Sequence, residues 1–256
     1  MSGKGMRSAA TFALGVLFLL AVWALAALAV GNEYMIPSIG ETLTAAGKLL
    51  LESGFWKAFF RSIRRAVAAF FVAFLLAGVL SVPASVCPAF AKFLSPMISL
   101  MRSLPVLAVL VVLLVFTGAG RAPVIVAVLA LLPMLYAGMC AALSKVPKEL
   151  KEMSRVYRVP MMRRIAKLYL PFAAPYVLKE CAAALSFAVK LVISAEILAN
   201  TAYSLGGMLQ EARLFLEVPR MFALVLAAVA AGGLLEGAGA LIVRGMKRRL
   251  ECESSD

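Results

Sequence analysis

The stretch Lys151–Pro171, KEMSRVYRVPMMRRIAKLYLP, places a dense run of positive charge between two long apolar segments. Apolar residues recur along it at helical spacing, at Met153, Val156, Val159, Met161, Ile165 and Leu168. Val159-Pro160 divides the stretch, because the residue before a proline disfavours the helical region and the proline itself suits a first helical turn. The pattern predicts two short helices that share an exposed apolar stripe.

The segments around this stretch have the composition of a membrane protein. The chain has 256 residues, of which 63% are hydrophobic and 15% are charged, and its mean hydropathy is +0.97. A run of about 20 apolar residues is long enough to cross a bilayer. We therefore expect an all-α integral membrane protein with about six transmembrane helices, at Thr11–Val30, Ala66–Val86, Met97–Thr117, Pro123–Leu143, Pro175–Ala199 and Pro219–Val243.

Two of these six spans need comment. The first exceeds the apolar length of about 7 to 15 residues that is typical of a signal peptide, so we interpret it as an uncleaved span. Prolines crowd the second and third spans and predict a kink or a break there, at Pro83, Pro88, Pro96 and Pro105.

The distribution of lysine and arginine predicts the orientation of the chain. Cytoplasmic loops carry an excess of these residues, and that excess is obtained when both termini are cytoplasmic. The loop 144–172, between the fourth and fifth spans, is then cytoplasmic as well. The exception is Arg61-Ser62-Ile63-Arg64-Arg65, where we expect the arginines to reach lipid headgroups. The basic residues lack the interleaved aromatics of a nucleic-acid surface, so no nucleic-acid partner is expected.

The composition also disfavours several kinds of chemistry. The chain has no histidine, and its four cysteines lack CxxC spacing. The sequence therefore lacks the residue patterns that zinc sites, disulfide frameworks and histidine-dependent catalysis usually require. The chain has no GxxxxGK[ST] motif for ATP. We expect one transmembrane domain over residues 1–256, with a polar and disordered tail at 251–256, and no catalytic residue, metal or cofactor in this chain.

Three simple explanations exist for the apolar stripe of the loop. It could lie on anionic lipid, it could be a positive loop without a partner, or it could pack against the ends of this chain's own spans. The residues alone leave these three open.

The loop resembles the permease subunits of binding-protein-dependent ABC importers. Those subunits carry E-A-A, three residues, G, nine residues, I, one residue and L-P. Here Glu152-Met153-Ser154, Arg158, Leu168 and Leu170-Pro171 keep every spacing, and Arg158 replaces the glycine. If that glycine permits a tight turn, Pro160 must set the turn here instead, or the ATPase partner is divergent.

Further stretches are similar to the nitrate, sulfonate and taurine branch of these importers. The resemblance covers about 62–249 and rests on these segments: Ser62-Ile63-Arg64-Arg65, Arg102-Ser103-Leu104-Pro105 with Ala108, Phe116-Thr117-Gly118-Ala119-Gly120, Ala195-Glu196 and Leu205-Gly206-Gly207.

The resemblance implies a bacterial inner-membrane permease that works as a homodimer. Its implied partners are an ABC ATP-binding subunit, which would hold ATP and Mg²⁺, an external solute-binding protein and membrane lipid. The implied substrate is a small organic or inorganic anion or a vitamin precursor. The residues expected to contact the ATPase are Glu152, Met153, Ser154, Arg155, Val156, Tyr157, Arg158, Met161, Leu170 and Pro171. The segment from Asn32 to Phe60 is expected to be one amphipathic stretch on the outer surface, and by the same resemblance it would touch the binding protein.

Charged residues inside the spans are candidates for the translocation path, because a charge at mid-bilayer costs roughly 2.5 to 3.5 kcal/mol on insertion scales. Glu196 is expected to line or gate the path, or else to be a satisfied interhelical partner. Lys190 is expected to pair with Glu236 or to meet an anionic substrate, and Arg102 is a third path candidate.

Two other functions compete with the permease interpretation. The scaffold of an energy-coupling-factor vitamin importer also uses basic coupling helices, but its paired Ala-Arg motifs are not evident here. A membrane-embedded lipid-modifying enzyme would need a cluster of acids, bases or metal ligands, which the sequence lacks.

Overall fold

The computed structural model describes residues 2–32 and 35–253; helical side chains are described except at 2–10, 12, 155, 240 and 242–253. In this part of the chain all regular structure is helical, as predicted. The helices are α1 (Ser2–Val30), α2 (Ile39–Leu51), α3 (Ser53–Val86), α4 (Pro88–Ser103), α5 (Val106–Thr117), α6 (Ala122–Ser144), α7 (Lys148–Val156), α8 (Met161–Arg164), the π-helical turn η1 (Ile165–Tyr169), α9 (Leu170–Ala199), α10 (Leu205–Leu214) and α11 (Val218–Glu253).

Among the described residues, five helical segments are long and apolar enough to cross a membrane. They are Ala13–Val30, Ser53–Val86, Ala122–Ser144, Met161–Ala199 and Val218–Gly239. The sixth expected span is the bent pair of α4 and α5, whose axes meet at 91°. The break predicted from the prolines of the span Met97–Thr117 is therefore confirmed, and it lies at Leu104-Pro105. Leu104 is extended before Pro105, because a proline disfavours the helical region in the preceding residue and cannot donate an N–H.

Four long helices form the core of the bundle. α3 packs against α6 and α9, and α9 packs against α11. The α3 face of this core consists of fully buried alanines at helical spacing, which are Ala66, Ala69, Ala73 and Ala77. Small residues let helix backbones approach closely, which is how helices associate inside a membrane.

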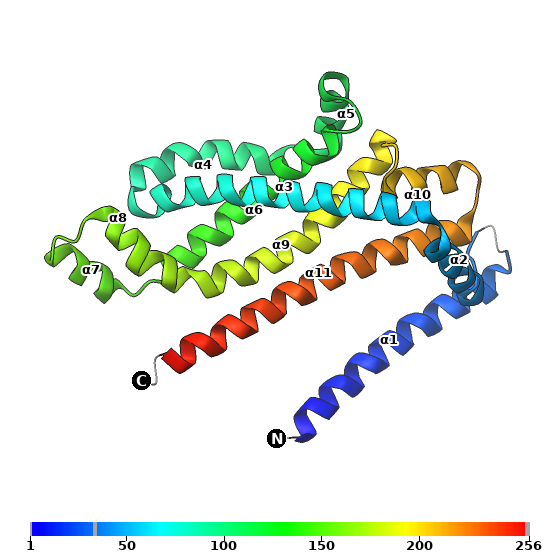
Figure 1. Cartoon of the computed structure of the whole chain (residues 1–256), viewed down its shortest axis with the longest axis horizontal. Coiled ribbons are helices and arrows are strands. Elements are labelled where there is room, and N and C mark those ends of the chain that lie inside the picture. The colour runs from blue at the N-terminus through cyan, green and yellow to red at the C-terminus, as the bar shows by residue number, and fades with distance from the viewer. Residues whose placement is uncertain (1, 33–34, 254–256) are drawn as a thin grey trace.

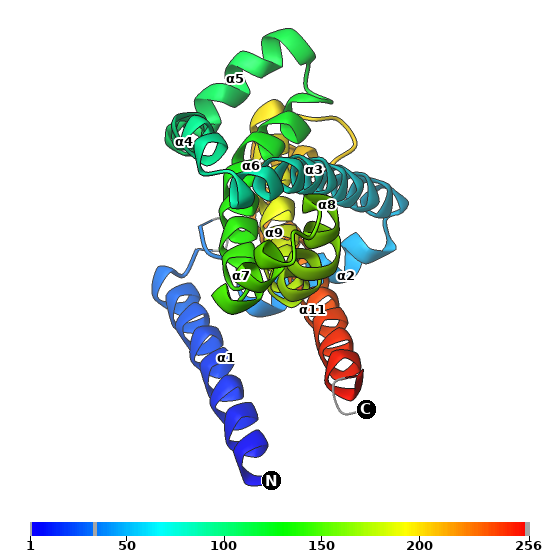
Figure 2. The same cartoon turned by 90° about the vertical axis from the view of Figure 1, so that its left-hand side faces the viewer.

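The elongated bundle has two distinct ends (Figure 1). α7 and α8 project at one end, and α2 and α10 cover the other; we call these the α7 end and the α10 end. α1 stands apart from the bundle in two views (Figures 1 and 2). Near its last turns, Trp23 stacks on Phe222 with ring centroids 5.7 Å apart and donates Nε1–H to the carbonyl of Pro37.

Two boundaries differ from the sequence expectations. The segment expected to be one amphipathic surface stretch contains α2 and the first turns of α3, separated at Glu52. Ser38 begins α2 through a capping box with Glu41, which fixes that helix start. The tail expected to be disordered over 251–256 is helical as far as Glu253, and its last three residues lie outside the described part.

Candidate functional site

The loop at the α7 end has the predicted helix-turn-helix form. α7 ends at Val156 and α8 begins at Met161, with Pro160 between them in an extended conformation (φ −53°, ψ 141°). This confirms the break predicted at Val159-Pro160. α8 then continues through the π-helical turn into α9, where Leu170 donates its N–H to the carbonyl of Ile165. The second loop helix is thus joined to a membrane span without a break.

The turn after α7 contains Arg158, which replaces the glycine of the permease motif and adopts a backbone conformation that favours glycine. Arg158 has a left-handed backbone with φ +48°. Val159 donates its N–H to the carbonyl of Ser154 at 3.1 Å, five residues back, which is the closing bond of a Schellman helix end. This motif favours glycine because the left-handed region strains a residue with a Cβ. Arg158 occupies the same turn at a steric cost.

Replacing Arg158 with glycine should therefore relieve strain in this turn. We expect Arg158→Gly to raise the free energy of unfolding by up to about 1 kcal/mol, because the steric cost of roughly 1–2 kcal/mol is partly offset by the greater freedom of unfolded glycine. Thermal unfolding of the purified chain measures this effect. A lower unfolding temperature would show that contacts of the arginine side chain outweigh the strain.

The two faces of α7 have opposite environments. Ser154 is 7% exposed, and its hydroxyl donates to the carbonyl of Lys151 at 2.7 Å. The Lys151 ammonium lies 5.7 Å from the centre of the Tyr169 ring, and Tyr169 belongs to a buried cluster with Ala142 and Val146. This face joins the loop to the ends of the spans.

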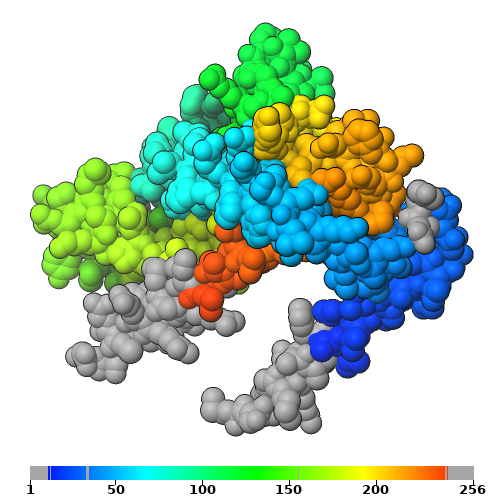
Figure 3. Space-filling model, turned by 45° about the vertical axis from the view of Figure 1, so that its right-hand side comes forward, coloured from blue at the N-terminus to red at the C-terminus, as the bar shows by residue number. Residues whose placement is uncertain are grey.

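The opposite face of the loop is apolar and open. Val156 and Tyr157 are 78% and 76% exposed, and Met153 and Met161 are about half exposed. We call these four residues the coupling face. The loop projects from the molecular surface in the space-filling view (Figure 3). The alternative in which the stripe packs on the chain's own span ends is therefore wrong for Met153, Val156 and Met161. It holds for Leu168, another residue of the stripe, which packs against the cluster at the span ends.

Three further expected ATPase contacts lie on α7 and at the start of α9. Glu152 is exposed beside the coupling face on α7, and Leu170 and Pro171 are exposed in the first turn of α9. The Arg155 side chain lies outside the described part. Among the expected contacts whose side chains the structure describes, Ser154 alone is buried.

A buried polar cluster lies near the α10 end, around Glu196 of α9. Glu196 is 0% exposed, and its carboxylate accepts hydrogen bonds from the Ser62 hydroxyl at 2.6 Å and the Arg65 guanidinium at 2.8 Å. The backbone N–H of Gly206 lies 3.4 Å from the same carboxylate, and that of Leu205 donates to Ser62 Oγ at 3.0 Å. These five residues, the Glu196 cluster, join α3, α9 and α10.

Close approach explains the glycine at position 206. A Cβ there would overlap the Cβ of Glu196 and lie 2.6 Å from the backbone nitrogen of Ile197. Three sequence stretches that support the family resemblance, around Ser62, Glu196 and Gly206, thus meet in one place.

The expectation that Arg65 reaches lipid headgroups is wrong, because its guanidinium is bonded to Glu196. The guanidinium of Arg61 lies 5.1 Å from the centre of the Tyr203 ring.

Lys190 and Glu236 do not form the expected pair. Both side chains are exposed, and none of the ion pairs found in the described part of the chain joins them. Gly232 of α11 faces Ser186 of α9, and Gly239 faces Ala182, so the two helices run antiparallel. Lys190 lies four residues after Ser186, and Glu236 lies four residues after Gly232, so the two residues lie in opposite directions from this contact. The helical rise then separates them by about 12 Å along the helix axes.

Arg102 lies in a groove of about 520 Å³ between α4, α6 and α9. Its guanidinium donates to the carbonyl of Pro133 at 3.3 Å. The groove also contains Glu180 of α9, an intramembrane carboxylate that the sequence analysis did not single out. Lys190 is not among the residues that line this groove.

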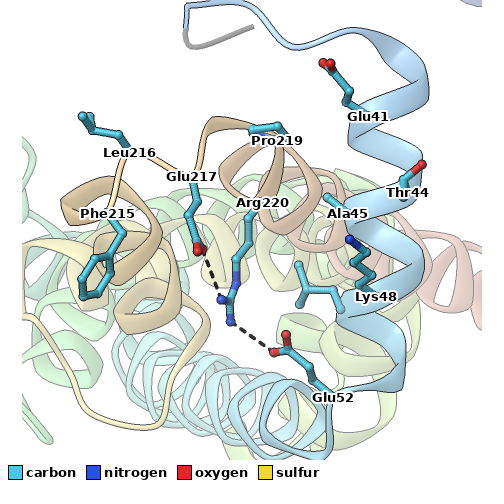
Figure 4. A pocket seen from close by; sticks show the side chains of 11 residues that line it. Glu41, Thr44, Ala45, Lys48, Glu52, Phe215, Leu216, Glu217, Pro219 and Arg220 are labelled. Carbon is cyan, nitrogen blue, oxygen red and sulfur yellow. Dashed lines mark hydrogen bonds and ion pairs between the residues drawn. The ribbon is translucent and has the colours of Figure 1, made fainter.

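The α10 end has a larger groove, of about 650 Å³, between α2 and the turn that joins α10 to α11. Arg220 bridges Glu52 at 3.1 Å and Glu217 at 3.2 Å across this groove (Figure 4). The turn beside it exposes the apolar residues Leu214, Phe215 and Leu216.

These features define a helical membrane protein with a helix-turn-helix segment that exposes an apolar face at one end. The family model described as "Binding-protein-dependent transport system inner membrane component" matches residues 75–249, and the chain belongs to this family. It is therefore a multi-pass inner-membrane protein and a permease subunit of an ABC importer.

Solved structures support the same fold. Two crystal forms of the MetNI methionine ABC transporter in inward-facing conformations match with TM-scores of 0.60 and 0.61 and identities of 21% and 23%. These matches cover 73% and 76% of this chain and 94% and 98% of the other chain. An amino acid ABC transporter crystallised with histidines matches at a TM-score of 0.61 and 14% identity, over 77% of this chain and 94% of the other. Comparison with curated protein sequences finds no match.

Proposed function

We propose that the coupling face docks onto a separate ABC ATP-binding subunit, which holds ATP and Mg²⁺ and drives this permease. The observation that carries the proposal is an apolar face on a helix whose opposite face is fixed to the span ends. Methionines and a tyrosine give such a surface adaptability, and Glu152 adds a charged rim that can form charge-assisted hydrogen bonds. Movement of the ATPase would reach α9 directly through α8 and the π-helical turn.

Two copies of this chain would enclose the translocation path. In this arrangement the α7 end and both termini are cytoplasmic, which agrees with the excess of basic residues there. The α10 end then faces outward and would receive the solute-binding protein. The groove between α2 and the α10–α11 turn, with its exposed apolar residues, supports that placement (Figure 4).

The Glu196 cluster would control the outer opening of the path. It joins α10 to α3 and α9 through one carboxylate, so these three elements would move together when the outer end opens. The proposed transported solute is a small organic or inorganic anion or a vitamin precursor, with the external binding protein choosing among them.

A charge reversal at Glu152 tests the coupling role. We expect Glu152→Arg to lower ATP-driven uptake about tenfold while membrane insertion stays normal, because the exposed side chain makes no contact that the fold requires. Uptake and ATP hydrolysis are measured in vesicles that contain the whole transporter. Uptake equal to that of the unchanged protein would contradict a coupling role for Glu152.

Purification in detergent separates the competing functions. Recovery of an ATP-binding subunit with this chain supports a transporter. Recovery with a vitamin-binding membrane subunit instead would favour an energy-coupling-factor scaffold. Recovery of this chain alone, together with lipid turnover, would favour a lipid-modifying enzyme.

A further inference from the structure

The groove that contains Arg102 and Glu180 lies within the membrane-spanning part of the bundle. Pro133, which forms part of its wall, is at the middle of α6. The 91° bend between α4 and α5 borders the groove, and Leu104 and Val106 on either side of the bend line it. Broken helices near the bilayer midplane are typical of solute sites in transporters. Phe187 and Leu191 of α9 give the groove an apolar wall.

One part of the groove is electropositive. In the part of the chain that the structure describes, the only side-chain hydrogen bond of Arg102 is the one to Pro133. The first helical N–H bond of α5 runs from Val109 to the carbonyl of Pro105 at 3.1 Å. The N–H groups of Val106 and the two residues after it therefore precede the helical ladder, at the positive end of the helix dipole. Together with the guanidinium, they favour an acidic group of a ligand.

Another part of the groove carries a negative group. Glu180 is half-buried in α9 and lies against Gly138 of α6, where a Cβ would come within 2.6 Å of the Glu180 Cγ. None of the ion pairs among the described residues includes Glu180. A carboxylate inside a span is costly, and the bare glycine surface gives it room beside the groove.

We propose that this groove is a subsite for a small zwitterion, in which Arg102 and the start of α5 bind a carboxylate or sulfonate and Glu180 binds an ammonium group. The proposal rests on the proposed transport function and restricts its substrate class to acidic solutes that also carry an ammonium group. A simple anion such as nitrate would meet Glu180 as a like charge, and a simple cation would meet Arg102. A solute with both charges satisfies both side chains, and its short carbon chain lies on Phe187 and Leu191.

Matched pairs of ligands test the subsite. Each pair consists of a zwitterion and the corresponding acid without the amine. The pairs are taurine and ethanesulfonate, β-alanine and propionate, and methionine and 4-(methylthio)butanoate. Each compound is titrated into the assembled permease–ATPase complex in lipid nanodiscs, without the binding protein. Saturation-transfer NMR detects weak binding. We expect at least one zwitterion to bind about tenfold or more tightly than its partner without the amine, the size expected for one charge-assisted hydrogen bond.

Substitutions assign that preference to the groove. Glu180→Gln keeps the side-chain shape and should reduce the preference to about one, and Arg102→Gln should weaken both members of a pair. Gly138→Ala displaces the Glu180 side chain without changing any charge and should also reduce the preference. Glu236→Gln changes an exposed carboxylate outside the groove and should leave it unchanged.

Several results would overturn the subsite. The first is that the unchanged complex binds both members of every pair equally, and the second is that it binds none of the six compounds. The third is that Glu180→Gln keeps the preference for the zwitterion over its partner without the amine. Failure of the subsite is distinguishable from failure of the transport proposal, because the second would show as an ATP-binding subunit that does not assemble with this chain.

Discussion

Replacing Glu196 with alanine is expected to lower the free energy of unfolding by about 3 kcal/mol. Removing one partner of a buried ion pair costs about 3–5 kcal/mol, because the other partner stays in the interior without its counter-charge. We expect the lower end of this range because the Arg65 side chain is 19% exposed and can regain some water. The Ser62 hydroxyl and the backbone N–H of Gly206 lose an acceptor in the same substitution.

Thermal unfolding in detergent measures this loss. Glu236→Ala is the matched control, because it removes an exposed carboxylate from a neighbouring span. Glu196→Gln keeps an acceptor oxygen but loses the ion pair, so its unfolding temperature should lie between those of Glu196→Ala and the unchanged protein. Equal unfolding temperatures for Glu196→Ala and its control would show that the Glu196 cluster does not hold α3, α9 and α10 together.

Placing a charge on the coupling face is expected to weaken ATPase binding about 30-fold or more. A residue at the centre of an interface commonly contributes 2 kcal/mol or more, and Val156→Asp would also bury a carboxylate in an apolar contact. Val156 is 78% exposed in the chain alone, so the substitution should leave folding and membrane insertion intact. Its effect should fall on association.

Co-purification of the ATP-binding subunit, followed by titration with it, measures this association. Leu214→Asp is the matched control, because it puts the same charge on an exposed apolar residue at the α10 end. If Val156→Asp leaves ATPase binding unchanged and instead detaches the loop from anionic lipid, seen as greater access of a water-soluble label to the loop, the stripe is a lipid contact.

The sequence was most informative where local pattern determines structure. Apolar length predicted the spans, and helical spacing with Val159-Pro160 predicted the two loop helices. The glycine position of the motif predicted a tight turn at residue 158, but not the backbone conformation of that turn. An arginine in the left-handed region has no recognisable pattern in the sequence. The structure shows the conformation that this position requires: Arg158 has a left-handed backbone, and Val159 donates its N–H to the carbonyl of Ser154.

Long-range contacts could not be predicted in the same way. Arg65 and Glu196 lie 131 residues apart in sequence, and the headgroup interpretation of Arg65 came from its position at a span end. Glu180 was missed because its significance depends on Gly138, Arg102 and the bend at Pro105. The prolines of the third span indicated a break. Because there are several of them, the sequence alone did not show at which proline the break lies.

Photo-cross-linking tests whether the coupling face meets an ATP-binding subunit. The photo-cross-linker p-benzoylphenylalanine replaces Tyr157, which is 76% exposed, and the complex is irradiated in native membranes. We predict a covalent product that joins this chain to the ATP-binding subunit. Cross-links found only to lipid or within this chain would contradict such a contact.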